Sequence, residues 1–145
     1  MKLVLLIEDE YGNAEVLGML LEEAGFRVTV ATNGKEGLEK LSGEKPALIL
    51  SDFMMPYLTG AELGTAVRAD PALADVPFVI ITATTEATVQ QRFKDYDAFV
   101  QKPYSADGLL KLIEHLATHG RPPPISERPE RDPILLKILA GLKFE

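Results

Sequence analysis

The 145-residue sequence predicts an α/β protein in which helices cover both faces of a five-stranded parallel sheet. Short apolar runs alternate with helical patterns through the first 120 residues, which favours right-handed β-α-β units. Three of these runs are almost entirely apolar, as expected for strands that are buried on both faces. The chain has no cysteine, so disulfides, thiolate metal sites and cysteine nucleophiles are excluded.

The N-terminal part predicts two strands and two helices. Residues 2–7 are an apolar run that predicts a central strand, and a helix that ends at Gly25 is expected near residues 12–24. Residues 27–31 mix polar and apolar side chains, as edge strands do, and Asn33 can cap the second helix. The apolar positions at helical spacing in the first helix are Val16, Leu17, Leu20, Leu21 and Ala24.

Two further central strands are expected in the middle of the chain. Residues 47–51 and 78–82 have the length and apolar character of buried strands. Between them, Thr59-Gly60-Ala61-Glu62 has the pattern of a capping box, which predicts the start of the third helix.

The remaining elements complete the alternation. Residues 86–94 predict a fourth helix, residues 97–101 predict a second mixed edge strand, and a fifth helix is expected from a cap at Ser105 to about His119. Apolar strands in the centre and mixed strands at the edges fit the doubly wound, flavodoxin-like order 2-1-3-4-5.

The composition changes near residue 120, where the predicted domain of residues 1–120 ends. Residues 121–132 predict an extended linker, because the tail holds five of the ten prolines. Residues 133–145 predict a short amphipathic helix that Asp132-Pro133 would begin. Its apolar stripe is Ile134, Leu135, Ile138, Leu139 and Leu142.

A helix of about ten residues is marginal alone in water, so the tail helix should form only when it is docked. It could pack on its own domain, join a second copy in a homodimer, or present its stripe to a target protein. A disordered remnant is the fourth alternative. Five large aliphatic side chains are unfavourable in water, which favours docking or a dimer contact.

Charge and hydropathy exclude several classes of partner. A net charge of −7 argues against nucleic acid and against an anionic membrane surface. No stretch approaches the 18 or more apolar residues of a membrane span, and the N-terminal run is too short and too acidic for a signal peptide. We expect a soluble, cytoplasmic protein.

Polar residues with complementary chemistry stand at the ends of four predicted strands. Glu8 and Asp9 follow the first strand, Asp52 the third, Thr82 ends the fourth, and Lys102 follows the fifth. Parallel strands bring their carboxyl ends to one edge of the sheet, which is where ligands bind in such folds. Any one polar residue could simply end a strand, but four complementary ends predict a site.

The chemistry of this set points to phosphoryl transfer. Clustered carboxylates repel one another unless a cation lies between them, and an oxygen-only ligand set suits Mg²⁺. A carboxylate beside Mg²⁺ and a lysine can attack a phosphoryl group and form an aspartyl phosphate.

Residues 1–120, about four-fifths of the chain, closely resemble the receiver domain of bacterial two-component response regulators, including the chemotaxis-regulator-like members. Four motifs in order carry the resemblance. They are Ile7-Glu8-Asp9-Glu10, Ser51-Asp52-Phe53-Met54-Met55-Pro56 leading to Gly60, Thr82-Ala83, and Lys102-Pro103.

The resemblance implies a role for each matching residue. Asp52 corresponds to the phosphoacceptor, and Glu8 and Asp9 would hold Mg²⁺ together with Asp52 and the backbone carbonyl of Met54. Glu8 stands where many members have aspartate. The residues that would respond to the phosphoryl group are Thr82 as the switch hydroxyl, Lys102 as the phosphate-pairing lysine and Phe99 as the switch aromatic, in place of the commoner tyrosine.

The resemblance also implies partners. A sensor histidine kinase or a phosphotransfer protein would supply the phosphoryl group, and a downstream protein would bind the fourth helix, fifth strand and fifth helix. That face or the C-terminal helix could also form a homodimer. We expect a stand-alone, phosphorylation-switched binding module, which catalyses only its own phosphorylation and hydrolysis and is not otherwise an enzyme.

Three alternatives remain open on the sequence alone. A phosphorelay intermediate would have the same motifs. A phosphorylation-independent scaffold would be expected to lack one of them, and none is missing. A small aspartyl-phosphate phosphatase would carry a second aspartate two residues after its nucleophile, where this chain has Met54.

Overall fold

The computed structural model describes residues 1–55, 58–122 and 133–142. The strands are β1 (Leu3–Ile7), β2 (Arg27–Ala31), β3 (Leu48–Asp52), β4 (Phe78–Thr82) and β5 (Ala98–Gln101). The helices are α1 (Tyr11–Glu23), α2 (Gly34–Leu41), α3 (Gly60–Ala69), α4 (Glu86–Gln90), α5 (Ala106–His119) and α6 (Pro133–Gly141). Within these described ranges, no helix combines the length and the apolar character needed to cross a membrane.

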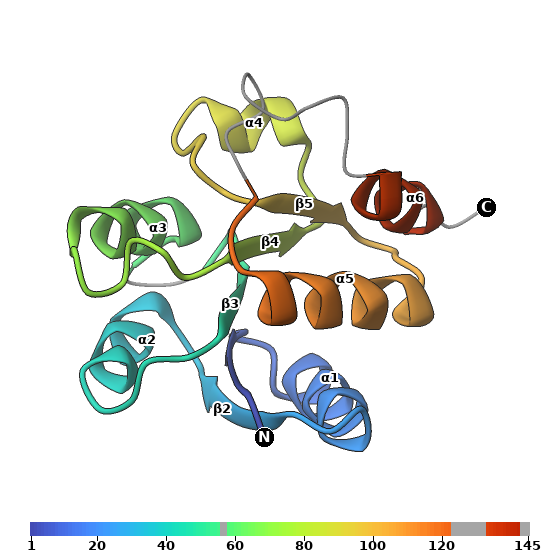
Figure 1. Ribbon diagram of the computed structural model, residues 1–145. Helices are drawn as coiled ribbons and strands as arrows, with labels where there is room; N and C mark the ends of the chain where they lie inside the picture. The colour runs from blue at the N-terminus through green and yellow to red at the C-terminus, as the bar shows by residue number, and fades with distance from the viewer. Residues whose placement is uncertain (56–57, 123–132, 143–145) are drawn as a thin grey trace.

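The five strands form one parallel sheet in the order β2-β1-β3-β4-β5, as predicted. Figure 1 shows α1 and α5 on one face of the sheet and α2 and α3 on the other. The central strands β1, β3 and β4 are buried throughout, whereas β2 and β5 at the edges are partly exposed. Strand β3 extends one residue further than expected, because Asp52 still pairs with Ile81 of β4.

The predicted helix caps are confirmed. The side chains of Asn33, Thr59 and Ser105 each accept an amide N–H from the first turn of α2, α3 and α5. Thr59 and Glu62 form the reciprocal capping box. Gly25 follows α1 with φ of 98°, a left-handed conformation that glycine adopts without strain.

Two details of the helices differ from the prediction. Val16 of α1 is 61% exposed and Ala24 is exposed as well, because α1 buries its stripe through Ala14, Leu17 and Leu21. Helix α4 ends at Gln90 and not near residue 94. After α4, the side chain of Phe93 is buried in the core.

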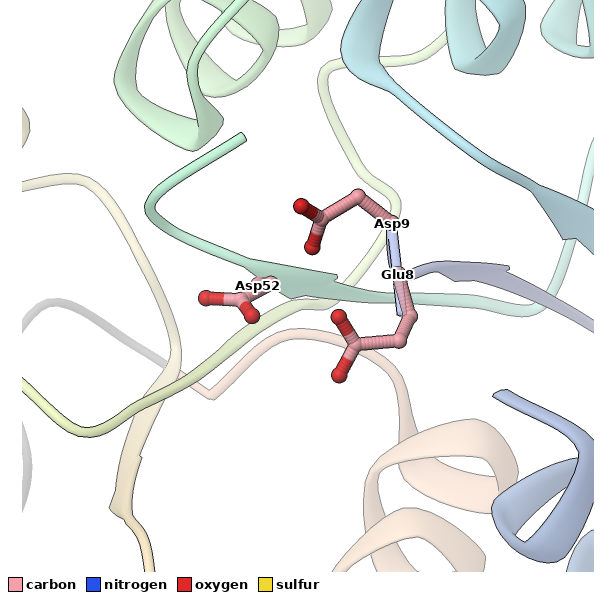
Figure 2. Close-up of side chains that lie close together, drawn as sticks. All are labelled: Glu8, Asp9 and Asp52. Atoms are coloured by element: carbon pink, nitrogen blue, oxygen red, sulfur yellow. The ribbon is translucent and has the colours of Figure 1, made fainter. Parts of the chain in front are cut away.

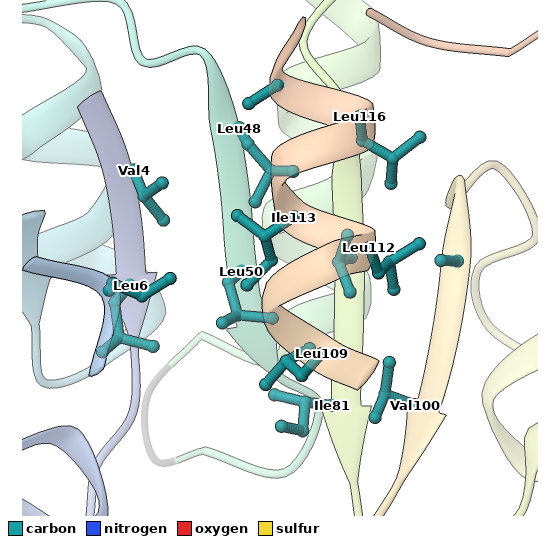
Figure 3. Close-up of a cluster of buried hydrophobic side chains, with 14 of the residues drawn as sticks. Val4, Leu6, Leu48, Leu50, Ile81, Val100, Leu109, Leu112, Ile113 and Leu116 are labelled. Atoms are coloured by element: carbon teal, nitrogen blue, oxygen red, sulfur yellow. The ribbon is translucent and has the colours of Figure 1, made fainter. Parts of the chain in front are cut away.

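The sheet has a hydrophobic core on each face. Helix α5 covers one face with an unbroken row of buried aliphatic side chains (Figure 3). The row is Leu109, Leu112, Ile113 and Leu116, and it packs with Val4, Leu6, Leu48, Leu50, Ile81 and Val100. The opposite core joins α2, α3 and α4 to the sheet, and Phe93 meets Phe78 edge to face at 5.5 Å there. Each fully buried leucine contributes about 1.5–3 kcal/mol to stability.

A buried ionic network connects α3, the start of β5 and the end of α5. The Asp97 carboxylate accepts hydrogen bonds from the Phe78 amide at 2.8 Å, from Arg68 Nη2 at 2.9 Å and from Arg121 Nε at 2.9 Å. Its side chain is 2% exposed, and that of Arg68 is 9% exposed. Arg121, the first residue of the expected linker, is therefore held against the domain, a contact that no sequence pattern predicted.

Helix α6 packs on its own domain, the first of the arrangements considered for the tail. Leu135 and Leu142 are buried in the core that α5 covers, and Ile138 and Leu139 pack against it in part. Ile134 is 62% exposed, so its predicted place on the buried stripe is wrong. The expected cap at Asp132 lies outside the described residues.

Candidate functional site

Three carboxylates meet at the carboxyl edge of the sheet. Glu8 and Asp9 directly follow β1, and Asp52 ends β3. Strands β1 and β3 are neighbours with Ile7 opposite Ser51, so both chains leave the sheet at the same level. One oxygen from each carboxylate lies within 4.8 Å of the others, and Figure 2 shows the three side chains gathered around one region. The predicted convergence of these residues is confirmed.

Lys102 brings a positive charge to two of these carboxylates. Its Nζ donates to Glu8 Oε1 at 3.1 Å and to Asp52 Oδ2 at 3.3 Å. Its backbone amide donates to the Thr82 carbonyl at 2.8 Å, which places Lys102 just beyond the ends of β4 and β5. Glu8 and Asp52 are buried, whereas Asp9 is exposed. One side of the cluster is thus neutralised by lysine, and the other faces solvent.

Burial and mutual repulsion dominate the electrostatics of the cluster. Burial raises the pKa of Glu8, the hydrogen bond from Lys102 opposes that rise, and the charge of Asp52 adds to it. Burial acts to lower the pKa of Lys102, but Asp52 and Glu8 together raise that pKa above its usual value. The two shifts have different main causes: burial raises the pKa of Glu8, whereas the two carboxylates raise the pKa of Lys102. The remaining negative charge favours a further cation.

The loop after Asp52 is tightly packed against the start of α3. The Met54 amide donates to Asp52 Oδ1 at 3.3 Å, and the Gly60 amide donates to the Phe53 carbonyl at 2.9 Å. A Cβ on Gly60 would lie 2.7 Å from the Asp52 carbonyl oxygen, so glycine is required for this approach. Met54 has an exposed side chain, and the metal-ligand role of its carbonyl stays a prediction.

Thr82 ends β4 beside the acidic cluster. Ile81 lies opposite Asp52 in the ladder, and Thr82 is therefore one residue beyond that level. The side chain is buried, and its hydroxyl accepts the Thr84 amide at 3.3 Å. The structure places a hydroxyl where the sequence predicted it, and the switching role stays a prediction.

Phe99 occupies the middle of β5, opposite Ile80 of β4. It is half-buried and packs against the core on the α3 and α4 side. Its ring lies 6.4 Å from that of Tyr96, which in turn lies 6.4 Å from that of Phe93. The predicted switch aromatic therefore ends a row of three rings, Phe93, Tyr96 and Phe99.

Tyr96 is a connecting residue that the sequence reasoning missed. Its phenol donates to the Glu86 carboxylate and accepts from Gln90 at 2.9 Å, which ties the segment before β5 to α4. Burial, with the Glu86 hydrogen bond, raises the pKa of Tyr96 to about 12, so the phenol stays protonated at neutral pH. Tyr96 precedes β5, whereas the polar residues that predicted the site lie at the carboxyl ends of strands.

Comparison with known proteins gives a consistent result. The profile of the response regulator receiver domain matches residues 4–114. Response regulator Rre1 of Synechocystis sp. is 34% identical over 116 residues, which are 78% of this chain and 50% of that protein. An uncharacterized 14.6 kDa protein of Leptolyngbya boryana is 34% identical over 116 residues, 77% of this chain and 86% of that protein.

A solved structure agrees with these sequence matches. The signal receiver domain of a signal transduction histidine kinase from Syntrophus aciditrophicus superposes with a TM-score of 0.77 at 26% identity. The match covers 90% of this chain and 96% of that domain. The chain thus spans nearly all of a separate receiver-domain structure but only half of Rre1.

Proposed function

The chain belongs to the response regulator receiver domain family, and on that basis we propose that Asp52 accepts a phosphoryl group and thereby switches a protein-interaction surface. The observation that carries this proposal is the Lys102 ammonium group, which contacts both Asp52 and Glu8 next to the exposed carboxylate of Asp9. In this arrangement the ammonium group can bind the oxygens of a phosphoryl group, and the carboxylates can hold a cation that positions that group for attack by Asp52.

The donor set fits Mg²⁺. Glu8, Asp9 and Asp52 offer carboxylate oxygens that approach one another within 4.8 Å, and the Met54 carbonyl would complete the protein ligands. When bound, Mg²⁺ would neutralise charge on the phosphoryl oxygens. The ion would also offset the repulsion that, with burial, raises the pKa of Glu8.

The residues of the chain then have separate tasks in the transfer. A carboxylate oxygen of Asp52 attacks phosphorus, and the bond from phosphorus to the donor nitrogen of a phosphohistidine breaks. The electron pair of that bond stays on the imidazole. Lys102 balances charge on the transferred group, and Thr82 donates a hydrogen bond to one of its oxygens.

The modification would act by shifting an existing equilibrium. A phosphoryl group adds a charge of about −1.5 to −2 and three acceptor oxygens, with which Thr82 and Lys102 interact in that state only. Thr82 moving toward the phosphoryl group would leave room for Phe99, and the ring of Tyr96 would carry the change to α4.

The partners follow from this chemistry. We infer a sensor histidine kinase or a phosphotransfer protein as the cytoplasmic donor, and a protein target as the receiver of the signal. A relay role, in which Asp52 passes the phosphoryl group to another histidine, uses the same residues. Apart from its own phosphorylation and hydrolysis, the domain would catalyse no reaction.

The direct test is the intact mass of the protein after incubation with acetyl phosphate and Mg²⁺. We expect the added mass of one phosphoryl group, which EDTA abolishes. If a folded sample gains no mass from acetyl phosphate or from phosphoramidate, the proposal is wrong and a phosphorylation-independent scaffold takes its place.

Mg²⁺ alone should stabilise the fold. At 100 times the dissociation constant, a ligand specific for the native state adds about 2.7 kcal/mol to the free energy of unfolding. We expect Asp9→Asn to remove most of this gain in a thermal melt with and without Mg²⁺. Glu10→Gln is the matched control, because Glu10 caps α1 through the amides of Gly12 and Asn13. An equal loss of the gain in both variants would contradict the predicted ligand set.

A further inference from the structure

Helix α6 lies directly against the first turns of α5 (Figure 1). A backbone hydrogen bond joins their ends: the amide of Ser105, the cap of α5, donates at 3.3 Å to the carbonyl of Leu142, which follows α6. Leu135 and Leu142 are only 3% and 7% exposed, which makes them part of the domain core. The tail helix thus occupies a face of the receiver domain that would otherwise be open to a partner.

Gly108 permits this close approach. A Cβ at this position would lie 2.9 Å from the carbonyl oxygen of Gly141 and 3.3 Å from the Cα of Leu142. Gly108 lies in the first turn of α5, three residues after the Ser105 cap. A side chain at position 108 would therefore push the end of α6 away from α5.

Four consecutive residues connect α6 with the acidic cluster. Lys102 begins this segment, 102–105, with its ammonium group on Asp52. Tyr104 is half-buried against the same core that holds Leu135 and Leu142. Ser105 ends the segment. Its amide donates to the Leu142 carbonyl, and its hydroxyl oxygen accepts the Gly108 amide at 3.2 Å.

We propose that α6 is a displaceable ligand of its own receiver domain, and that phosphorylation of Asp52 releases it through segment 102–105. A phosphoryl group places new oxygens beyond the carboxylate that Lys102 now contacts, so the lysine must change position to pair with them. In this proposal the movement of Lys102 extends to its backbone and along segment 102–105 to Ser105. At 3.3 Å, the bond from Ser105 to Leu142 has little tolerance for lengthening.

This inference rests on the proposed phosphorylation of Asp52 and extends it to regulation. Release would expose the part of α5 that Gly108 and its neighbours form, a surface suited to an aliphatic helix. Coupling between two sites is reciprocal, so weaker docking of α6 should in turn favour the phosphorylated state. Typical coupling changes affinity by about 5- to 150-fold.

Hydrogen–deuterium exchange on the full chain tests the release. With acetyl phosphate and Mg²⁺, we expect the amides of α6 to exchange about fivefold faster or more, while β1 and β3 stay protected. The intact mass of the same samples separates the two proposals. Added mass with unchanged or slower exchange in α6 overturns the inference alone, whereas no added mass overturns both.

Two glycine variants test the contact without phosphorylation. Gly108→Ala should undock α6, which increases its exchange to the level of the phosphorylated protein and raises the phosphorylated fraction at a given concentration of acetyl phosphate. Gly18→Ala is the matched control, because a Cβ there meets nothing within 4 Å, and it should change neither quantity. Leu142→Ser, which disrupts the docked face from the other side, should reproduce the effect of Gly108→Ala. Protected α6 amides in both Gly108→Ala and Leu142→Ser would overturn the inference.

Discussion

Asp52→Asn is expected to abolish phosphorylation by acetyl phosphate while the domain remains folded. The asparagine amide has nearly the same shape, and its oxygen can still accept the Met54 amide. Lys102 keeps its contact with Glu8 at 3.1 Å, so no buried charge loses its last partner. What disappears is the anionic oxygen that attacks phosphorus, and without it no acyl phosphate forms.

Intact mass with acetyl phosphate and Mg²⁺ measures this loss, and far-ultraviolet circular dichroism checks the fold. Asp75→Asn provides a matched loss of one carboxylate, since Asp75 is exposed and pairs with Lys45 at 2.8 Å. This control should gain a phosphoryl group as the parent does. Parental incorporation in Asp52→Asn would mean that a different residue is the acceptor.

Asp97→Ala should lower the free energy of unfolding by about 3–5 kcal/mol, the typical effect of removing one partner from a buried ion pair. The substitution leaves the Arg68 guanidinium buried without the carboxylate that it contacts at 2.9 Å. It also leaves the Phe78 amide without its acceptor and frees Arg121 Nε. Burial already lowers the pKa of Arg68, which reflects how unfavourable its charge is at this position.

Urea unfolding measures this difference. Asp75→Ala is the comparison, because it breaks an exposed pair and should change the free energy of unfolding by about 1 kcal/mol or less. A loss below about 1 kcal/mol for Asp97→Ala would show that the network contributes no more than a surface ion pair.

The parts of the fold that the sequence predicted are those in which local chemistry and tertiary structure agree. Continuous apolar runs predicted β1, β3 and β4, because a strand covered on both faces is apolar on both sides until it reaches the edge of the sheet. Polar residues at strand ends gave the site, since parallel strands place their carboxyl ends together. Thr59 and Glu62 marked the start of α3 through a reciprocal pair within one turn.

The features that were missed depend on contacts between distant residues. In the sequence, Asp97 is only the first residue of a predicted edge strand, yet its partner Arg68 lies 29 positions earlier. Phe93 continues a helical pattern, but its burial against Phe78 ends α4 early. For α6, the apolar stripe predicted that the helix would be docked. That it docks on its own domain depends on the close backbone contact at Gly108, which no local pattern shows.

Arg121 has a mechanical consequence for the tail. Its guanidinium holds Asp97 at 2.9 Å and Asp95 at 2.5 Å, directly after α5 and before α6. Along the chain, a displacement of α6 therefore meets these two ion pairs, just before β5, before it reaches the last turn of α5. Arg121 thus fixes the end of α5 independently of α6, so α6 can dock or be released while the buried aliphatic row of α5 stays packed on the sheet.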